Sequence, residues 1–327
     1  MTTERIVAAD GRSRTRRCCY EPKMVEAMTA RDDMFASVIV GVDGRSGGRD
    51  AIVLAKQLAA ARARLLLANV YGHGGMFDRD VLAATGQRDR ATALLVQARV
   101  EESIEAEFVV RNDRSPSRGL HQLVENEHAD LIVVGSTHRG PVGRVVLGDT
   151  TLATLNGAPC AVAIAPRGYA LEPHSLTTIG VGHDGSEESE LALRAARAVA
   201  ARHGSAIRAL SVVGLQSAPN ADAEPLHWTE QTERVMSNER ARLAGIEGVE
   251  GDVIYGDPGE QLVALSESLD LLLVGSRGYG SWGRLINGST STYLTRRIGC
   301  PLLVLPRGRT SPGAPSQGPG AHAAPAP

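Results

Sequence analysis

The chain carries one pattern twice, about 140 residues apart. The segment DLIVVGS at 130–136 matches DLLLVGS at 270–276, and SVIVGVDG at 37–44 matches TIGVGHDG at 178–185. Cys160 and Cys300 occupy matching positions near the end of each copy. This self-similarity predicts two domains of one fold, and a length of 327 residues suits two cores of ordinary size.

Each half alternates short apolar runs with helical segments. A run without polar alternation, such as Leu271–Val274, is typical of a strand covered on both faces of a parallel sheet. Alternating strands and helices predict a doubly wound α/β fold with right-handed crossovers. We expect strands near 37–42, 65–71, 105–111, 130–135, 160–165, 207–213, 271–274 and 302–305. We expect helices near 51–61, 90–102, 118–127, 150–156, 187–202 and 227–244, a further helix from Pro258, and a loop over 72–87.

Spaced glycines follow the strand at 271–274. Gly275, Gly278 and Gly288 are followed directly by Ser289 and Thr290. Glycines permit positive φ and let a ligand approach the backbone, and the first turn of a following helix can hold an anion. The segment therefore indicates phosphate binding, although glycine-rich loops also form ordinary turns.

These motifs resemble those of the universal stress protein family, and the chain looks like two such domains in tandem. The family pattern is an Asp that closes the first strand and the spacing G-x2-G-x9-G-[ST] after the fourth, and the second half has both. The resemblance implies two doubly wound five-stranded parallel sheets of strand order 3-2-1-4-5, in an adenine nucleotide alpha hydrolase-like α/β fold. It also implies that the fifth strands, 160–165 and 300–305, pair to form an internal pseudo-dimer, and it leaves a further homodimer open.

The resemblance covers residues 35 to 307 and divides the chain into parts. We expect domains at 35–168 and 177–307, joined by a proline-marked linker at 169–176. Residues 1–34 and 308–327 have the compositions of disordered tails.

In an open parallel sheet of this strand order, ligands bind between the first and fourth strands. The resemblance implies an adenine nucleotide there, ATP with Mg²⁺. It directs Asp184 and the backbone near Val213 to adenine and ribose, and Gly275 and Gly278 to ribose and phosphate. Gly288, Ser289 and Thr290 would hold the phosphates, and Arg277 would add positive charge.

Each of these assignments has a simpler alternative. Asp184 also fits a turn-forming role in the Asp-Gly dipeptide, and Arg277 also fits a solvated surface position. We interpret His183 and Trp282 as packing or surface residues.

The first half departs from the family pattern. His138 stands where the second half has Gly278, and Asp149 stands where it has Ser289. A carboxylate at a helix N-terminus is a good cap, but it repels a phosphate by about 1 to 4 kcal/mol at about 4 Å. We therefore predict a weak or empty first site, in which Asp43, Gly135, Gly148 and Thr150 remain.

Other classes of protein fit less well. With 35 basic and 37 acidic residues, no overall field favours nucleic acid or a membrane surface, and no GxxxxGK[ST] motif is present. Residues 278–283 match GxGxxG literally, but the strand expected at 302–305 lacks the acidic residue that binds ribose in dinucleotide folds. No apolar run approaches membrane-spanning length, and we expect a cytoplasmic location.

Three functions are compatible with these features. The first is an ATP-binding sensor or regulator in stress or dormancy, which rests on the resemblance. The second is a slow ATPase or phosphoryl-transfer enzyme, although the sequence offers no general base with a partner and no carboxylate pair for metal. The third is a protein-interaction module that binds no nucleotide.

Overall fold

A computed structural model describes residues 34–72, 81–137, 141–172, 175–214, 225–276, 294 and 297–306. The strands are β1 (Ser37–Gly41), β2 (Arg64–Tyr71), β3 (Glu107–Asn112), β4 (Leu131–Gly135), β5 (Ala161–Ala165), β6 (Thr178–Gly182), β7 (Ala206–Val213), β8 (Glu250–Tyr255), β9 (Leu271–Gly275) and β10 (Leu302–Leu305). The helices are α2 (Ser46–Leu58), α3 (Val81–Glu101), α4 (Pro116–Glu127), α5 (Asp149–Leu155), α6 (Glu187–His203), α7 (Pro225–Ala244) and α8 (Pro258–Ser266). No helix in these residues is both long and apolar enough to cross a membrane.

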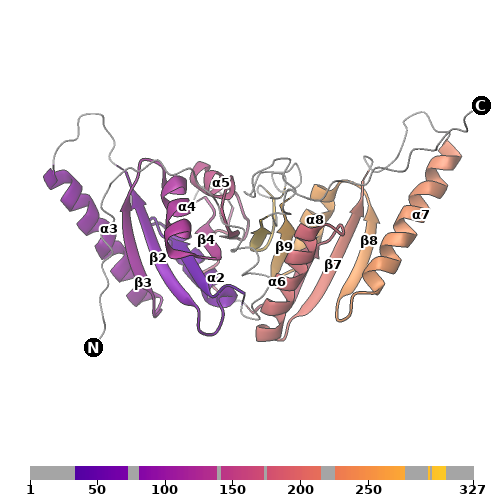
Figure 1. Ribbon diagram of the computed structural model, residues 1–327, viewed down its shortest axis with the longest axis horizontal. Helices are drawn as coiled ribbons and strands as arrows, with labels where there is room; N and C mark the ends of the chain where they lie inside the picture. Colours follow the sequence, from indigo (N-terminus) through magenta and orange to yellow (C-terminus); the bar gives the residue numbers. More distant parts are fainter. Residues whose placement is uncertain are drawn as a thin grey trace, which may run out of the picture.

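The strands form one continuous ten-stranded sheet. Its order is β3-β2-β1-β4-β5-β10-β9-β6-β7-β8, so each half has the predicted order 3-2-1-4-5. The pairs within each half are parallel, as βαβ units require. Figure 1 shows the two halves side by side, with α3 and α7 at the outer ends of the sheet.

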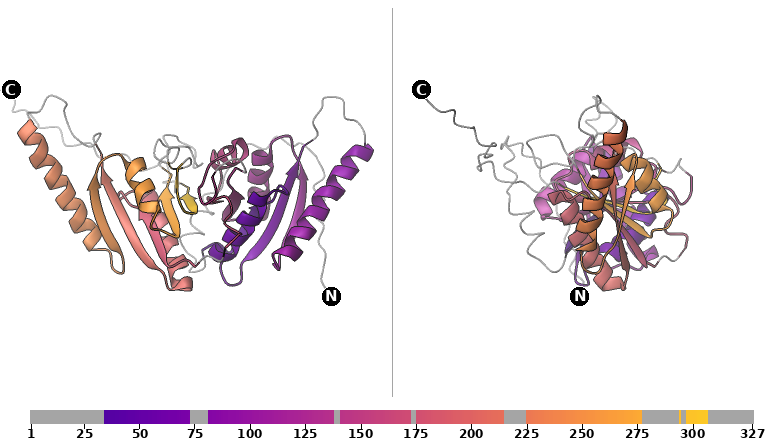
Figure 2. Two further views of the ribbon diagram at one scale, coloured as in Figure 1. Left: turned by 180° about the vertical axis from the view of Figure 1, so that it is seen from behind. Right: turned by 90° about the vertical axis from the view of Figure 1, so that its right-hand side faces the viewer.

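The two halves meet at β5 and β10, which pair antiparallel. Leu303 lies opposite Ala163, and Leu302 lies opposite Ile164. These residues are fully buried, because helices cover the seam on both faces of the sheet. The predicted pairing of the fifth strands is therefore confirmed, and the two expected sheets are joined into one (Figure 2).

Two apolar layers sandwich the sheet, and each runs through both halves. One layer joins α2, α3 and α6 to alternate strand residues such as Val40 and Leu303. The other joins α4, α5 and α8 to the intervening residues, such as Ile39 and Leu302. This alternation follows from side chains that point to opposite faces along a strand. Cys160 and Cys300 lie in the second layer as free thiols, and burial raises the pKa of both.

The chain leaves the first half through a turn held by a buried carboxylate. Asp50 on α2 is 2% exposed, and its two oxygens accept hydrogen bonds from the backbone of Gly168 at 2.9 Å and Ala170 at 2.8 Å. Between them, Tyr169 is buried and its hydroxyl bonds Gln57 at 2.5 Å. The start of the segment between the halves is thus anchored to α2.

Two helices begin earlier than the sequence predicts. Helix α2 begins at Ser46 instead of Ala51, and α3 begins at Val81, inside the expected loop at 72–87. The loop prediction at 72–87 gave weight to its glycine residues, which are poor helix formers. Gly47 lies in the first turn of α2, where a Cβ would be 3.2 Å from the Ser136 carbonyl oxygen, and the exposed Gly86 is tolerated within α3 with open space around it.

Helix α8 begins at Pro258, as the sequence predicts, and a side chain caps it. The Asp257 side chain accepts a hydrogen bond from the Glu260 backbone at 3.0 Å, and Pro258 occupies the first turn. We expect Asp257→Ala to lower the free energy of unfolding by about 1 kcal/mol, whereas Asp257→Asn, which keeps the acceptor, should change it little. Urea denaturation followed by circular dichroism measures both, and equal losses in the two variants would contradict a capping role.

Candidate functional site

The candidate sites, called the first and second crevice from here on, are the switch points at the carboxyl ends of β1 and β4 and of β6 and β9. These strands are direct neighbours, and the connections leave them in opposite directions across the sheet. Such a switch point is where ligands enter open parallel sheets. The strand ends bring the turn carrying Asp184 to the same edge of the sheet as Gly275 and Ser276.

Asp184 lies in the turn between β6 and α6 and is exposed. Its Oδ1 accepts hydrogen bonds from the Ser186 backbone at 3.0 Å and the Ser186 hydroxyl at 2.5 Å. Gly185 has a φ of 77°, in the left-handed region, and Ser186 caps α6 by accepting from the Ser189 backbone at 3.2 Å. Asp184 therefore forms the turn, and the hydrogen bonds from Ser186 fix the orientation of its carboxylate.

Gly275 and its counterpart Gly135 each permit a helix to approach a strand end. A Cβ on Gly275 would lie 2.6 Å from the Glu188 Cβ on α6, and one on Gly135 would lie 2.2 Å from the Gly47 carbonyl oxygen on α2. No side chain fits at such distances without movement of the helix. Packing alone therefore requires glycine at both positions.

A buried hydroxyl follows each of these glycines. Ser276 is 1% exposed and Ser136 is 8% exposed, and neither hydroxyl has a hydrogen-bond partner within the part of the chain that the structure describes. A buried unpaired hydroxyl is uncommon and calls for an explanation, because its desolvation is uncompensated. Both stand at the carboxyl end of the strand that borders a candidate crevice.

The remaining second-site predictions are only partly described. Val213 is buried at the end of β7, and its carbonyl accepts from the Gly256 backbone at 3.1 Å. Arg277, Gly278, Gly288, Ser289, Thr290 and Trp282 lie outside the described residues, as does His138 of the first half.

The first-domain residues surround the start of α5. Gly148 is its N-cap, Asp149 and Thr150 lie exposed in its first turn, and Asp43 accepts from the Arg45 backbone at 3.0 Å. Unlike Gly135, Gly148 is not forced by packing, since the nearest atom to an added Cβ is Thr137 Cβ at 3.5 Å.

The loop that precedes α5 contacts the other half. The Val145 backbone donates to the Ile298 carbonyl at 3.0 Å, and Arg144 forms an ion pair with Glu267 at 3.0 Å and donates to the Arg297 carbonyl at 3.0 Å. In the first half, the loop of the candidate site therefore also serves the contact between the halves.

His183 was interpreted from sequence as a packing or surface residue, and the structure buries it with polar partners. Its Nδ1 lies 2.7 Å from Nη1 of Arg242, and its Nε2 lies 3.1 Å from Oε1 of Glu190. Because arginine only donates, Nδ1 is the acceptor and Nε2 carries the hydrogen. Burial lowers the pKa of His183, and the nearby Arg242 charge lowers it further, so the imidazole is neutral near pH 7.

Arg242 is held in turn by Glu239 on the same helix. Glu239 Oε2 accepts from Arg242 Nε at 3.2 Å and from Arg242 Nη2, and it also accepts from the Ser211 hydroxyl at 2.9 Å. Sequence reasoning missed this network, because His183 and Arg242 are 59 positions apart and no local pattern links them.

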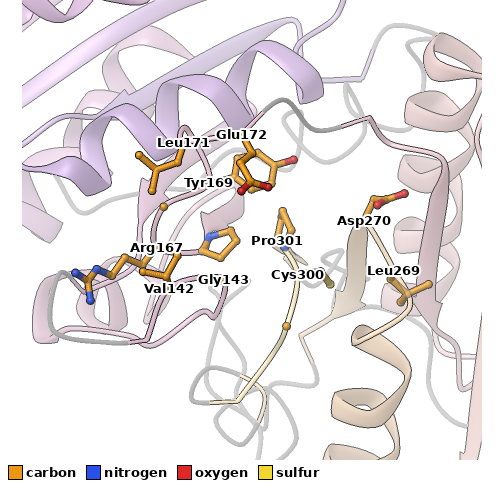
Figure 3. A pocket seen from close by; sticks show the side chains of 13 residues that line it. Val142, Gly143, Arg167, Tyr169, Leu171, Glu172, Leu269, Asp270, Cys300 and Pro301 are labelled. Carbon is orange, nitrogen blue, oxygen red and sulfur yellow. The ribbon is translucent and has the colours of Figure 1, made fainter.

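No group of three or more His, Cys, Asp or Glu side chains in the described residues is arranged to hold a metal ion. A cavity of about 230 Å³ does lie between the halves, lined by residues that include Tyr169, Leu171, Asp270 and Cys300 (Figure 3). It is bordered by the segments just before β9 and β10. It is therefore at the opposite end of β9 from Gly275 and is separate from the second crevice.

Comparison with known proteins gives consistent results. The model of the universal stress protein family matches residues 34–166 and 176–306. Universal stress proteins of Mycobacterium bovis and Mycobacterium tuberculosis are each 30% identical over 237 residues, covering 69% of this chain and 80% of the relative. The crystal structure of a universal stress protein from Archaeoglobus fulgidus has a TM-score of 0.60 at 21% identity and covers 83% of this chain and 98% of that chain, which supports the shared fold.

Proposed function

The chain belongs to the universal stress protein family, and from this membership we propose that its second domain binds ATP with Mg²⁺ and that the protein acts as a sensor or regulator in stress or dormancy. Membership supports the role in the stress response. The nucleotide assignment rests on the second crevice and on its motif.

The observation that carries the assignment is the convergence of Asp184 and Ser276 at the switch point between β6 and β9. Among the described residues, the buried Ser276 hydroxyl has no hydrogen-bond partner, and a polar ligand in the crevice would supply one. This fits a nucleotide, which carries many hydrogen-bonding oxygens.

The proposed contacts follow the family pattern. Asp184 and the Val213 backbone would bind adenine and ribose, and Gly275 and Gly278 would contact ribose and phosphate through the backbone. Gly288, Ser289 and Thr290 would hold the phosphates, with Arg277 adding positive charge. Mg²⁺ would supply charge neutralisation at the phosphate oxygens.

In the first domain, we propose that nucleotide binding is weak or absent. Asp43, Gly135, Gly148 and Thr150 are retained around its crevice. The exposed carboxylate of Asp149, however, stands in the first turn of α5, where a phosphate would otherwise bind.

Calorimetric titration with Mg-ATP tests this assignment on protein stripped of nucleotide. We expect about one ATP per chain, binding that is lost in Gly288→Asp, and unchanged binding in the matched first-domain variant Gly148→Asp. Two ATP per chain would instead assign a working site to the first domain. No binding up to millimolar ATP would leave a protein-interaction module, and sustained phosphate release that disappears in Gly278→Asp would favour the slow ATPase.

A further inference from the structure

In the second domain, a guanidinium covers the turn that carries Asp184. A Cβ on Gly185 would lie 3.3 Å from both Cζ and Nη1 of Arg242, so the arginine packs directly on the backbone next to Asp184. Glu239 holds one edge of the guanidinium and His183 holds the other. Helix α7 is thereby tied to the border of the second crevice.

The first domain builds the same turn with apolar cover. Val42 stands in place of His183, and a Cβ on Gly44 would lie 2.2 Å from Cδ1 of Leu94 on α3. Asn69, the counterpart of Ser211, donates to the Val42 carbonyl at 2.6 Å. The fold therefore does not need the polar network, which occurs in the half with the intact nucleotide motif.

We propose that His183 is a positioning residue for the second-domain site: it holds Arg242 over the turn of Asp184, and protonation of its imidazole releases that hold. The proposal rests on the proposed ATP binding of this domain. Its basis is geometric, because Nδ1 can accept from Arg242 only while it carries no hydrogen.

Protonation of His183 would place its Nδ1 hydrogen against an N–H group of Arg242. It would also place the imidazolium charge against the guanidinium charge. The charged groups that face the imidazole are Glu190 from α6 and Arg242 and Glu239 from α7, while β7 contributes the Ser211 hydroxyl near Glu239. The lowered pKa of His183 means that the hold is complete above its usual value of 6.5 and is lost as pH falls through a lower value.

The test measures Mg-ATP affinity by calorimetry in wild type and variants at pH 7.5 and at a lower pH, chosen below the His183 pKa after NMR titration of its imidazole. His183→Val, which copies the first domain, should weaken binding about tenfold at pH 7.5, because Arg242 loses an acceptor. His183→Asn, whose side-chain oxygen can accept from Arg242, should bind within about twofold of wild type at pH 7.5. At the lower pH, His183→Asn should bind more tightly than wild type.

ATP itself becomes protonated as pH falls, and this changes the affinity of all variants alike. Comparing the variants at the same pH therefore cancels that contribution. His128→Asn serves as a matched control, since His128 is exposed in the first domain with a φ of 51° that Asn adopts readily. It should keep the pH dependence of wild type.

The outcomes separate this inference from the proposed function. If wild type binds ATP and His183→Val binds equally well, the positioning role is overturned and ATP binding stands. If wild type and His183→Asn lose affinity equally between pH 7.5 and the pH below the His183 pKa, release by protonation is overturned. If wild type binds no ATP, both proposals are overturned together.

Discussion

Leu303→Asp should lower the free energy of unfolding by more than about 4 kcal/mol, because it places an unpaired carboxylate in the seam between the halves. Leu303 is fully buried on β10, opposite Ala163 of β5, and it packs in the layer that runs through both halves. A charge there has neither water nor a partner. Guanidinium denaturation monitored by circular dichroism measures the loss.

Leu171→Asp is the matched control, since Leu171 is 75% exposed and the same change should cost less than about 0.5 kcal/mol. If Leu303→Asp does not accumulate as folded protein, Leu303→Ala provides a milder version with an expected loss of about 2 to 5 kcal/mol. Similar stabilities for Leu303→Ala and wild type would contradict a buried seam.

Gly135→Ala should destabilise the first half by about 3 kcal/mol, because the added methyl group would lie 2.2 Å from a backbone oxygen of α2. A backbone atom cannot rotate away as a side chain does, so the helix must shift. Thermal and urea unfolding measure the loss.

Gly148→Ala makes the same chemical change at a place with room for it, and it should cost less than about 1 kcal/mol as a slightly poorer N-cap. The two glycines occur in one sequence motif, yet only Gly135 is required by packing. Equal losses in the two variants would show that the close approach of α2 to β4 is not the reason for glycine at 135.

Much of the fold could be predicted because the strands are uninterrupted apolar runs. Leu271–Val274 and its repeat were predicted to be buried strands, and the family resemblance then supplied an order that the sheet confirms. The starts of α2 and α3 were not predicted from the local sequence. At Gly47 the deciding factor is its fit against the end of β4, which lies almost 90 residues away in sequence.

The position of the candidate site in the fold could be predicted to a similar extent. Strand ends locate Asp184 and Gly275 at one edge of the sheet, and both lie there in the structure. The contacts around these residues could not be predicted from local sequence. Gly275 packs on α6 and Arg242 donates to His183, and both contacts join residues that are distant in the chain. An isolated histidine next to an aspartate shows nothing of a partner 59 positions later.

Because both halves belong to one polypeptide, the surface that each half contributes to the seam does not have to be self-complementary. In a symmetric dimer, one mutation alters both sides of the interface at once. Here Arg144 meets Glu267 across the seam, while Glu127, at the position matching Glu267, pairs with Arg64 of its own half at 2.8 Å. Linkage thus allows the two halves to diverge, as the proposed ligand site in only one of them requires, and it keeps the unequal partners together at any protein concentration.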